Sequence, residues 1–181
     1  MMSNNPDTLM GLGYEARREK RLEDAKQLFA EAVEFCRSGA EDHAVLARSL
    51  TGLGQIERDL KNNAQAPQHY EEAASIYRSL PDPLRLAHTI RHAGDILRNQ
   101  GSLEQARPCY EEALTIYRGH AETPDLELAN AIRGFALLAA DAGETDRATT
   151  LWREARELYI AVNVQAGVHE SDAQLRRLAG R

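Results

Sequence analysis

Residues 54–78 read GQIERDLKNNAQAPQHYEEAASIYR, and residues 94–118 read GDILRNQGSLEQARPCYEEALTIYR. The two segments align without a gap at a shift of 40 residues, and both contain YEEA and end in IYR. Self-similarity at a fixed period is typical of proteins built from an array of small structural units. The pair therefore predicts further copies on either side.

Four series of positions carry the repeat through the chain at spacings of 41, 40 and 42 residues. They are a small residue, a first alanine, an aromatic residue and a second alanine: Gly13, Gly54, Gly94 and Ala136; Ala25, Ala66, Ala106 and Ala148; Phe29, Tyr70, Tyr110 and Trp152; Ala32, Ala73, Ala113 and Ala155. The first helix of the fourth copy is less regular, because Gly134 offers a competing alignment. Four series with the same succession of spacings indicate four copies of one unit.

Each unit is expected to be a pair of antiparallel helices. The small residue of the first helix lets the second approach, the two alanines face back towards it, and the aromatic residue fills the gap to the neighbouring unit. Each pair leaves an apolar face open, so the units have to stack to bury it. We expect a single domain over residues 1–181, with units at about 6–40, 41–80, 81–121 and 122–162 and a capping helix at about 168–179.

Capping residues set the expected helix boundaries. Asn5, Asp82 and Thr123 each precede a proline and are expected to cap the first helices of three units. Ser102 followed by Gln105 predicts a capping box for a second helix. The expected helices before the capping helix span 6–20, 23–37, 43–61, 64–79, 83–100, 103–118, 124–142 and 145–161, with inner turns at residues 61–63, Gly101 and Gly143.

The pattern resembles the tetratricopeptide repeat. The clearest copy carries the motif as Leu53, Gly54, Ala66, Tyr70 and Ala73. The units are longer than the usual ~34 residues and resemble the long variants of kinesin light chains and of bacterial regulatory proteins. The resemblance implies an all-α solenoid, a right-handed superhelix whose first helices line a concave groove. It also implies a scaffold or adaptor that binds a peptide or protein segment, or a regulatory peptide sensor.

Composition limits the classes of function. The chain has 181 residues and a net charge of −6, which argues against binding nucleic acid through bulk charge. The two cysteines, Cys36 and Cys109, are too few for a secreted disulfide scaffold. The sequence has no apolar run of membrane-spanning length and no signal-peptide pattern at its start. We therefore expect a cytoplasmic protein.

Motifs of catalysis and metal binding are missing from the sequence. It contains no phosphate-binding glycine loop, no paired-cysteine zinc motif, no HExxH and no nucleophile elbow. His88 and His92 stand four residues apart on an expected helix, but two solvated or groove-lining histidines explain them more simply than a metal site. We expect no cofactor, no metal and no enzymatic activity.

The candidate binding residues are a basic series on the first helices. Arg17, Arg58 and Arg98 each lie four residues after the small residue of their unit, on the face that the resemblance places in the groove. A row of guanidinium groups suits an acidic or carboxylate-ended peptide. The full set of candidate groove residues is Arg17, Arg48, Gln55, Arg58, His88, Arg91, Arg98, Asn99, Asn130 and Arg133.

Two alternatives stay open at this point. Asp59, Asp95 and Asp141 lie on or near the same face, so the arginines could form only solvated ion pairs. Self-assembly is a second functional class, because the first unit lacks a polar capping helix and Leu9 and Leu12 are expected to face solvent or a partner. This alternative predicts a homodimer or a monomer–dimer mixture.

Overall fold

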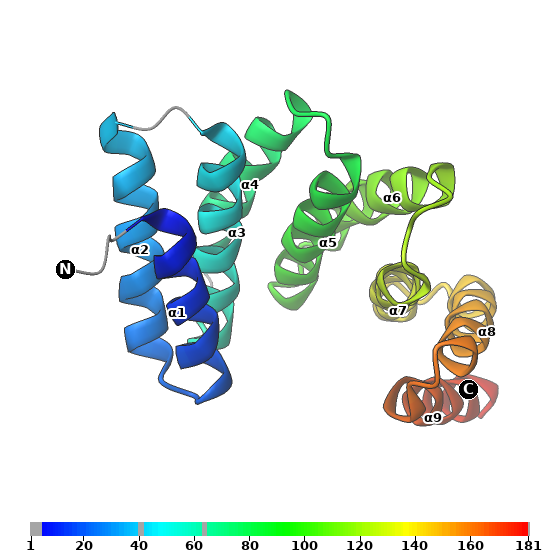
Figure 1. Cartoon of the computed structure of the whole chain (residues 1–181). Coiled ribbons are helices and arrows are strands. Elements are labelled where there is room, and N and C mark those ends of the chain that lie inside the picture. The colour runs from blue at the N-terminus through cyan, green and yellow to red at the C-terminus, as the bar shows by residue number, and fades with distance from the viewer. Residues whose placement is uncertain (1–4, 40–41, 63–64, 181) are drawn as a thin grey trace. The chain divides into compact units, whose positions relative to one another are not determined.

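The computed structural model describes residues 5–39, 42–62 and 65–180, and that part of the chain is all-α (Figure 1). The described helices are α1 (Pro6–Arg18), α2 (Leu22–Gly39), α3 (His43–Asp59), α4 (Ala66–Arg78), α5 (Pro83–Asn99), α6 (Leu103–Gly119), α7 (Asp125–Asp141), α8 (Thr145–Ala161) and α9 (Gln165–Ala179). The expected all-helical fold class is therefore confirmed, with helix bounds close to the predicted ones. Only α9 departs by a full turn's width, because it begins at Gln165 rather than near residue 168.

The caps agree with the sequence at two of four places. The Asn5 side chain accepts a hydrogen bond from the Thr8 backbone N–H at 2.8 Å, and Asp82 caps α5 in the same way. The prediction for Thr123 was wrong, because its hydroxyl donates to the Tyr117 carbonyl at 2.8 Å. The Ser102 capping box was also wrong, because Ser102 makes no side-chain cap bond.

The inner turns of the four hairpins share one backbone device. Lys20, Lys61, Gly101 and Gly143 have positive φ values of 64°, 63°, 79° and 78°, and they recur at the repeat spacing. A left-handed residue there ends the first helix and lets the chain reverse. The predicted turns are thus confirmed at Lys61, Gly101 and Gly143, while Asn63 lies outside the described residues.

The helices group into two compact units, residues 1–89 and 90–181, and the division falls within α5. In the first unit α1 packs on α2, α3 packs on α4, and α2 packs on α3. In the second unit α6 packs on α7, α7 on α8, and α8 on α9. Hairpins that stack through their second helices are the arrangement that the repeat predicts. The single domain expected from the sequence stays a prediction.

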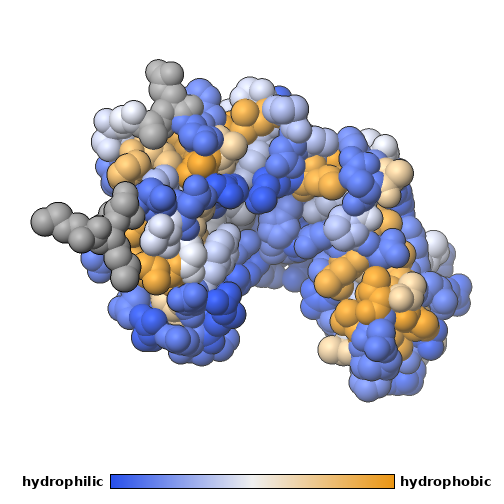
Figure 2. All heavy atoms as spheres, viewed as in Figure 1, coloured by the Kyte–Doolittle hydropathy of each residue, from blue (hydrophilic) through white to orange (hydrophobic). Residues whose placement is uncertain are grey.

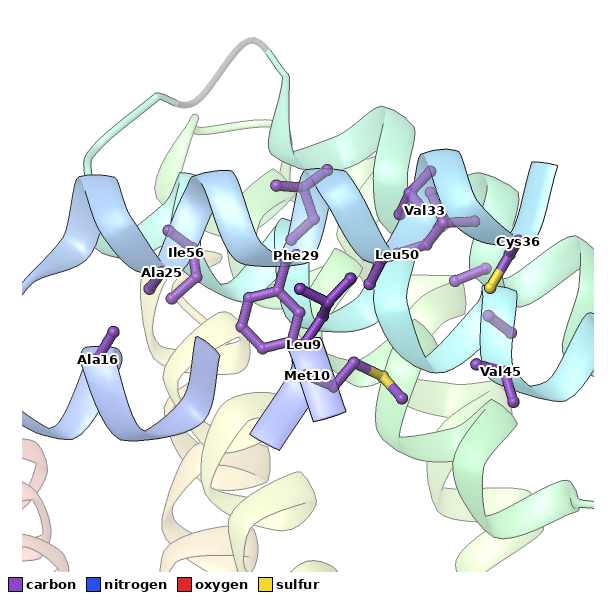
Figure 3. Packing of buried hydrophobic residues seen from close by; sticks show 14 of the residues in the cluster. Leu9, Met10, Ala16, Ala25, Phe29, Val33, Cys36, Val45, Leu50 and Ile56 are labelled. Carbon is purple, nitrogen blue, oxygen red and sulfur yellow. The ribbon is translucent and has the colours of Figure 1, made fainter. Parts of the chain in front are cut away.

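Phe29 of α2 is the centre of the first unit's core. Its ring is fully buried among side chains from α1, α2 and α3, including Leu9, Met10 and Ile56 (Figure 3). Two glycines flank it: a Cβ atom added at Gly13 of α1 would lie 2.9 Å from the ring, and one added at Gly52 of α3 would lie 2.2 Å from it. The ring therefore touches the backbone of its own hairpin and of the next.

Tyr110 of α6 repeats this arrangement in the second unit. Its ring lies 3.3 Å from the place of a Cβ at Gly94 and 2.6 Å from that of one at Gly134. Gly134 is thus the counterpart of Gly52, the glycine that faces the preceding hairpin. The fourth copy therefore aligns Ala136 with Gly94, as the repeat series predicts, and Gly134 is not the competing counterpart of Gly94.

A pair of glycine variants tests this packing. Gly52→Ala should lower the free energy of unfolding by about 1–3 kcal/mol, because the new methyl group overlaps a ring that has no room to move. Gly11→Ala is the matched control: it sits in the same helical context, and among the described residues no atom lies within 4 Å of its added methyl group. Because alanine favours helix, it should raise stability by up to about 1 kcal/mol. Urea unfolding measures both, and an equal effect at the two sites would contradict the packing.

Candidate binding surface

Arg17 on α1 is held by two side chains of α3. Its Nε atom donates to Asp59 Oδ2 at 2.7 Å, and its Nη1 atom donates to Gln55 Oε1 at 3.1 Å. Arg58 Nη2 donates to the other oxygen of the same carboxylate at 3.2 Å. Two of the predicted arginines therefore meet at Asp59. Their charges hold the pKa of Asp59 below its usual value, although burial acts in the opposite direction.

Two further predicted residues join this group. The Gln55 amide nitrogen lies 3.3 Å from Nε2 of His88 on α5, and Arg48 forms an ion pair with Asp7 of α1. Gln55 links α1 to α5, since it contacts Arg17 on one side and His88 on the other. The structure thus brings the predicted residues of α1, α3 and the start of α5 onto one surface.

Tyr14 and Arg85 belong to the same surface, and the sequence analysis missed both. Burial raises the pKa of Tyr14, and the positive charges of Arg17, Arg85 and Arg48 oppose that rise. The ring packs edge-on against Phe29 with centroids 4.9 Å apart, yet Tyr14 keeps 37% of its surface exposed. Its position was readable, because Tyr14 stands one repeat spacing before Gln55.

We call this set the first-unit arginine surface: Tyr14, Arg17, Arg48, Gln55, Arg58, Arg85 and His88. Among the described ion pairs, its four guanidinium groups meet the carboxylates of Asp7, Asp59 and Asp82. Four arginines thus lie on one surface of a protein whose net charge is −6. The pairs are also partly exposed, and such pairs contribute only about 0–1 kcal/mol each. Replacing an aspartate of such a pair with another carboxylate would therefore cost little free energy.

In the second unit, the predicted Arg91 is buried and lies between acidic residues. Arg91 is 9% exposed at its side chain, and its guanidinium lies 3.2 Å from Asp95 and 3.9 Å from Glu127. Asp95 also lies 3.3 Å from His92 and accepts a hydrogen bond from the Tyr110 hydroxyl at 2.7 Å. Burial alone would raise the pKa of Asp95, but its hydrogen bonds and cationic neighbours lower it from 3.8 to about 2. Arg91 and Asp95 thus belong to the interior.

The remaining predicted residues are paired within the second unit. Arg133 holds Glu170 of α9 in a two-pronged contact at 2.6 and 2.7 Å. Arg98 donates to Asp141 at 3.1 Å and to Asn99 at 2.9 Å, and Asn130 accepts from the Tyr159 hydroxyl at 2.9 Å. Together with Arg91, these arginines meet four described carboxylates, those of Asp95, Glu127, Asp141 and Glu170. The dilution by acidic residues expected from the sequence is therefore greatest here.

Other candidate chemistry is structural. Tyr77, Tyr117 and Tyr159 are buried, and burial is the main cause that raises the pKa of Tyr159 to about 12. Within residues 5–39, 42–62 and 65–180, no group of three or more His, Cys, Asp or Glu side chains is placed to hold a metal ion. No helix in this part of the chain is long and apolar enough to cross a membrane. Cys36 is buried, and Cys109 is partly buried.

Comparison with known families decides what the repeat is. Residues 6–79 match one tetratricopeptide repeat family and residues 86–121 match another, and together these matches span more than half of the chain. The chain belongs to the tetratricopeptide-repeat family. Tetratricopeptide repeats generally mediate binding to other proteins, so this chain is built as a protein-interaction module. No curated protein matches its sequence.

Solved structures agree on the tetratricopeptide-repeat fold. BtubC (BKLC) from P. vanneervenii is 21% identical with a TM-score of 0.78, and the alignment covers 91% of this chain and 68% of that one. Aspartyl phosphate phosphatase F from Bacillus subtilis is 16% identical with a TM-score of 0.82, over 92% of this chain and 43% of that one. This chain thus spans less than half the length of the phosphatase. At these identities the likeness concerns the fold alone.

Asp95 gives the second unit a pH dependence that can be measured. Its pKa is lower in the folded chain than in the unfolded one, so its contribution is present above about pH 4 and is lost as the pH falls towards 2. Between about pH 4 and pH 2, the free energy of unfolding of the wild type should fall by about 1–2 kcal/mol more than that of Asp95→Asn. Glu122→Gln, a change at an exposed loop position, is the control. An unchanged slope in Asp95→Asn would mean that the aspartate is not stabilised by its neighbours.

Proposed function

We propose that this chain is a cytoplasmic adaptor or scaffold that binds an acidic or carboxylate-ended segment of another protein on the first-unit arginine surface. The observation that carries the proposal is the gathering of four arginines, Arg17, Arg48, Arg58 and Arg85, on a surface that also holds the partly exposed Tyr14. Arg17, Arg48 and Arg85 all act on the Tyr14 hydroxyl, which stays protonated at neutral pH and can donate a hydrogen bond. The proposal is one of binding and not of catalysis.

The geometry favours an extended ligand. Guanidinium groups come from three successive first helices, and each can hold a carboxylate by two parallel hydrogen bonds. Arg17 is pre-positioned, because Gln55 and Asp59 already occupy its Nη1 and Nε atoms and orient its plane. Pre-positioning reduces the entropy lost when a ligand binds. The proposal does not rest on Arg91, Arg98, Asn99, Asn130 or Arg133, which lie in the carboxylate-rich second unit.

A defined peptide tests the proposal. The probe is a fluorescein-labelled peptide in which glutamate alternates with threonine, because alternate side chains of an extended chain point to one face. We expect the full chain to bind it by fluorescence anisotropy, more weakly as salt rises, and to bind the matched glutamine peptide at least about tenfold more weakly. Arg48→Glu with Arg85→Glu should abolish binding without loss of helix content.

Arg18→Glu is the control variant, because Arg18 lies beside Arg17 on α1 but is 72% exposed and pairs only loosely, at 4.0 Å, with Glu15. It changes the net charge like each of the other substitutions and should leave the affinity nearly unchanged. Equal losses in Arg18→Glu and in the double variant would reduce the effect to overall charge. Equal binding of the glutamate and glutamine peptides would refute the proposal.

Self-association stays the alternative prediction. The first hairpin exposes Leu12 and Phe35, which gives two copies an apolar contact, whereas Leu9 is buried and takes no part. Light scattering over a dilution series measures the mass directly. A mass near twice 20.2 kDa that falls on dilution would confirm a dimer. A constant monomer would exclude it and would leave the acidic-segment proposal intact.

A further inference from the structure

The outer face of the first hairpin has the residues of a stacking face, and it carries side chains that are exposed in the described part of the chain. Leu12 of α1 is 44% exposed, whereas Phe135, at the same place in the fourth unit, is buried and stacks on Tyr110 at 5.9 Å. Thr8 is exposed, whereas Ser49 at its place in the second unit is fully buried. Figure 2 shows hydrophobic atoms at the surface over α1 and α2.

Gly11 is the clearest part of this face. It stands one repeat spacing before Gly52, and the same series continues through His92 to Gly134. The two later glycines, Gly52 and Gly134, each lie against the aromatic ring of the preceding hairpin, Phe29 or Tyr110. At Gly11 no described atom lies within 4 Å of an added Cβ. Among the described residues, the first hairpin therefore has a glycine at the place where an aromatic ring packs in two other hairpins, but no ring packs against it.

The interfaces between neighbouring hairpins also pair a cation with a glutamate, and the cation stands eight residues after the aromatic ring. Arg37, eight residues after Phe29, holds Glu72 of α4 at 2.9 Å. Arg118, eight residues after Tyr110, holds Glu154 of α8 at 2.7 Å. In the first hairpin the corresponding acidic residue is Glu31, which is exposed on α2 and near in sequence to the half-exposed Phe35.

We infer that the outer face of the first hairpin docks a helix of another protein that presents an aromatic side chain and, eight residues later, an arginine or lysine. The ring lies over Gly11 beside Leu12, and the cation pairs with Glu31. This site is distinct from the first-unit arginine surface, so it goes beyond the proposed function. It extends the stack by one helix and covers the apolar residues that the first hairpin leaves exposed.

A second copy of the chain matches this face less well. Docked face to face, two copies would bring the same acidic stretch of α2 together, including Glu31 and the 74% exposed Glu34, and like charges disfavour that contact. Docked head to tail, a copy would offer α9, because α9 packs against α8 of the last hairpin. α9 has no phenylalanine, tyrosine or tryptophan, so it brings no aromatic ring of this kind to Gly11.

The experiment uses the full chain and a helical probe of known fit. The probe is a fluorescein-labelled peptide with the sequence of residues 22–39 carrying Cys36→Ser, because this helix occupies the equivalent face of the second hairpin. Anisotropy should rise on titration with the chain. Peptides that also carry Phe29→Ala or Arg37→Glu should bind at least about tenfold and about fivefold more weakly, respectively.

Two variants of the chain locate the site. Gly11→Trp places a bulky ring at this position, where no described atom lies within 4 Å of the added Cβ, and should weaken the probe by at least about tenfold while thermal stability is retained. Glu31→Arg should weaken the probe and should restore binding of the peptide that carries Arg37→Glu. Glu104→Arg, the same charge change at an exposed position on α6, is the control and should have no effect.

Three results would overturn the inference. The first is probe binding that is unchanged by both Gly11→Trp and Glu31→Arg, because the peptide would then bind elsewhere. The second is a full chain that binds no probe at all while it remains folded and monomeric. The third is a dimer that Gly11→Trp or Phe35→Glu converts to a monomer, since a second copy would then occupy the face.

Discussion

An aromatic ring held between two glycines is the contact on which the stacking of hairpins depends. Phe29 touches the backbone at Gly13 in its own hairpin and at Gly52 in the next, and Tyr110 does the same with Gly94 and Gly134. One buried ring thus fixes both the spacing within a hairpin and the spacing to its neighbour. A side chain larger than hydrogen at either glycine would push the helices apart, because close-packed interiors tolerate little added volume.

The close packing of the helices also determines which polar side chains can reach one another. Where the first helices of neighbouring hairpins lie side by side, residues about one repeat spacing apart come within reach of each other, as Arg17 and Asp59 or Arg98 and Asp141 do. The two units use this proximity differently. The first gathers four arginines on a surface that leaves Tyr14 partly exposed, whereas the second surrounds its arginines with acidic residues and buries Arg91. Similar packing of rings on glycines therefore underlies a partly exposed arginine surface in one unit and a more deeply buried network of ion pairs in the other.

The fold could be predicted from the sequence because the decisive residues recur in every unit. Small residues, an aromatic residue and two alanines recur at the same places in all four units, so their spacing predicts how each hairpin packs. The site could be predicted only in part, because ion pairs depend on which side chains meet across helices. Arg17 and Gln55 were found from periodicity, yet their contact with Asp59 and His88 needs the structure. Tyr14 was readable from its place one repeat spacing before Gln55, whereas nothing in the repeat pattern distinguished Arg85.

A double-mutant cycle on Phe29 and Gly52 tests the central claim most directly. Gly52→Ala, Phe29→Leu and the combined variant are unfolded in urea alongside the wild type. If the methyl group is destabilising because it overlaps the ring, replacing the ring with leucine relieves the overlap, and the two effects are coupled by at least about 1 kcal/mol. Effects that add to within about 0.3–0.5 kcal/mol would show that Gly52 is needed for another reason and would contradict the account.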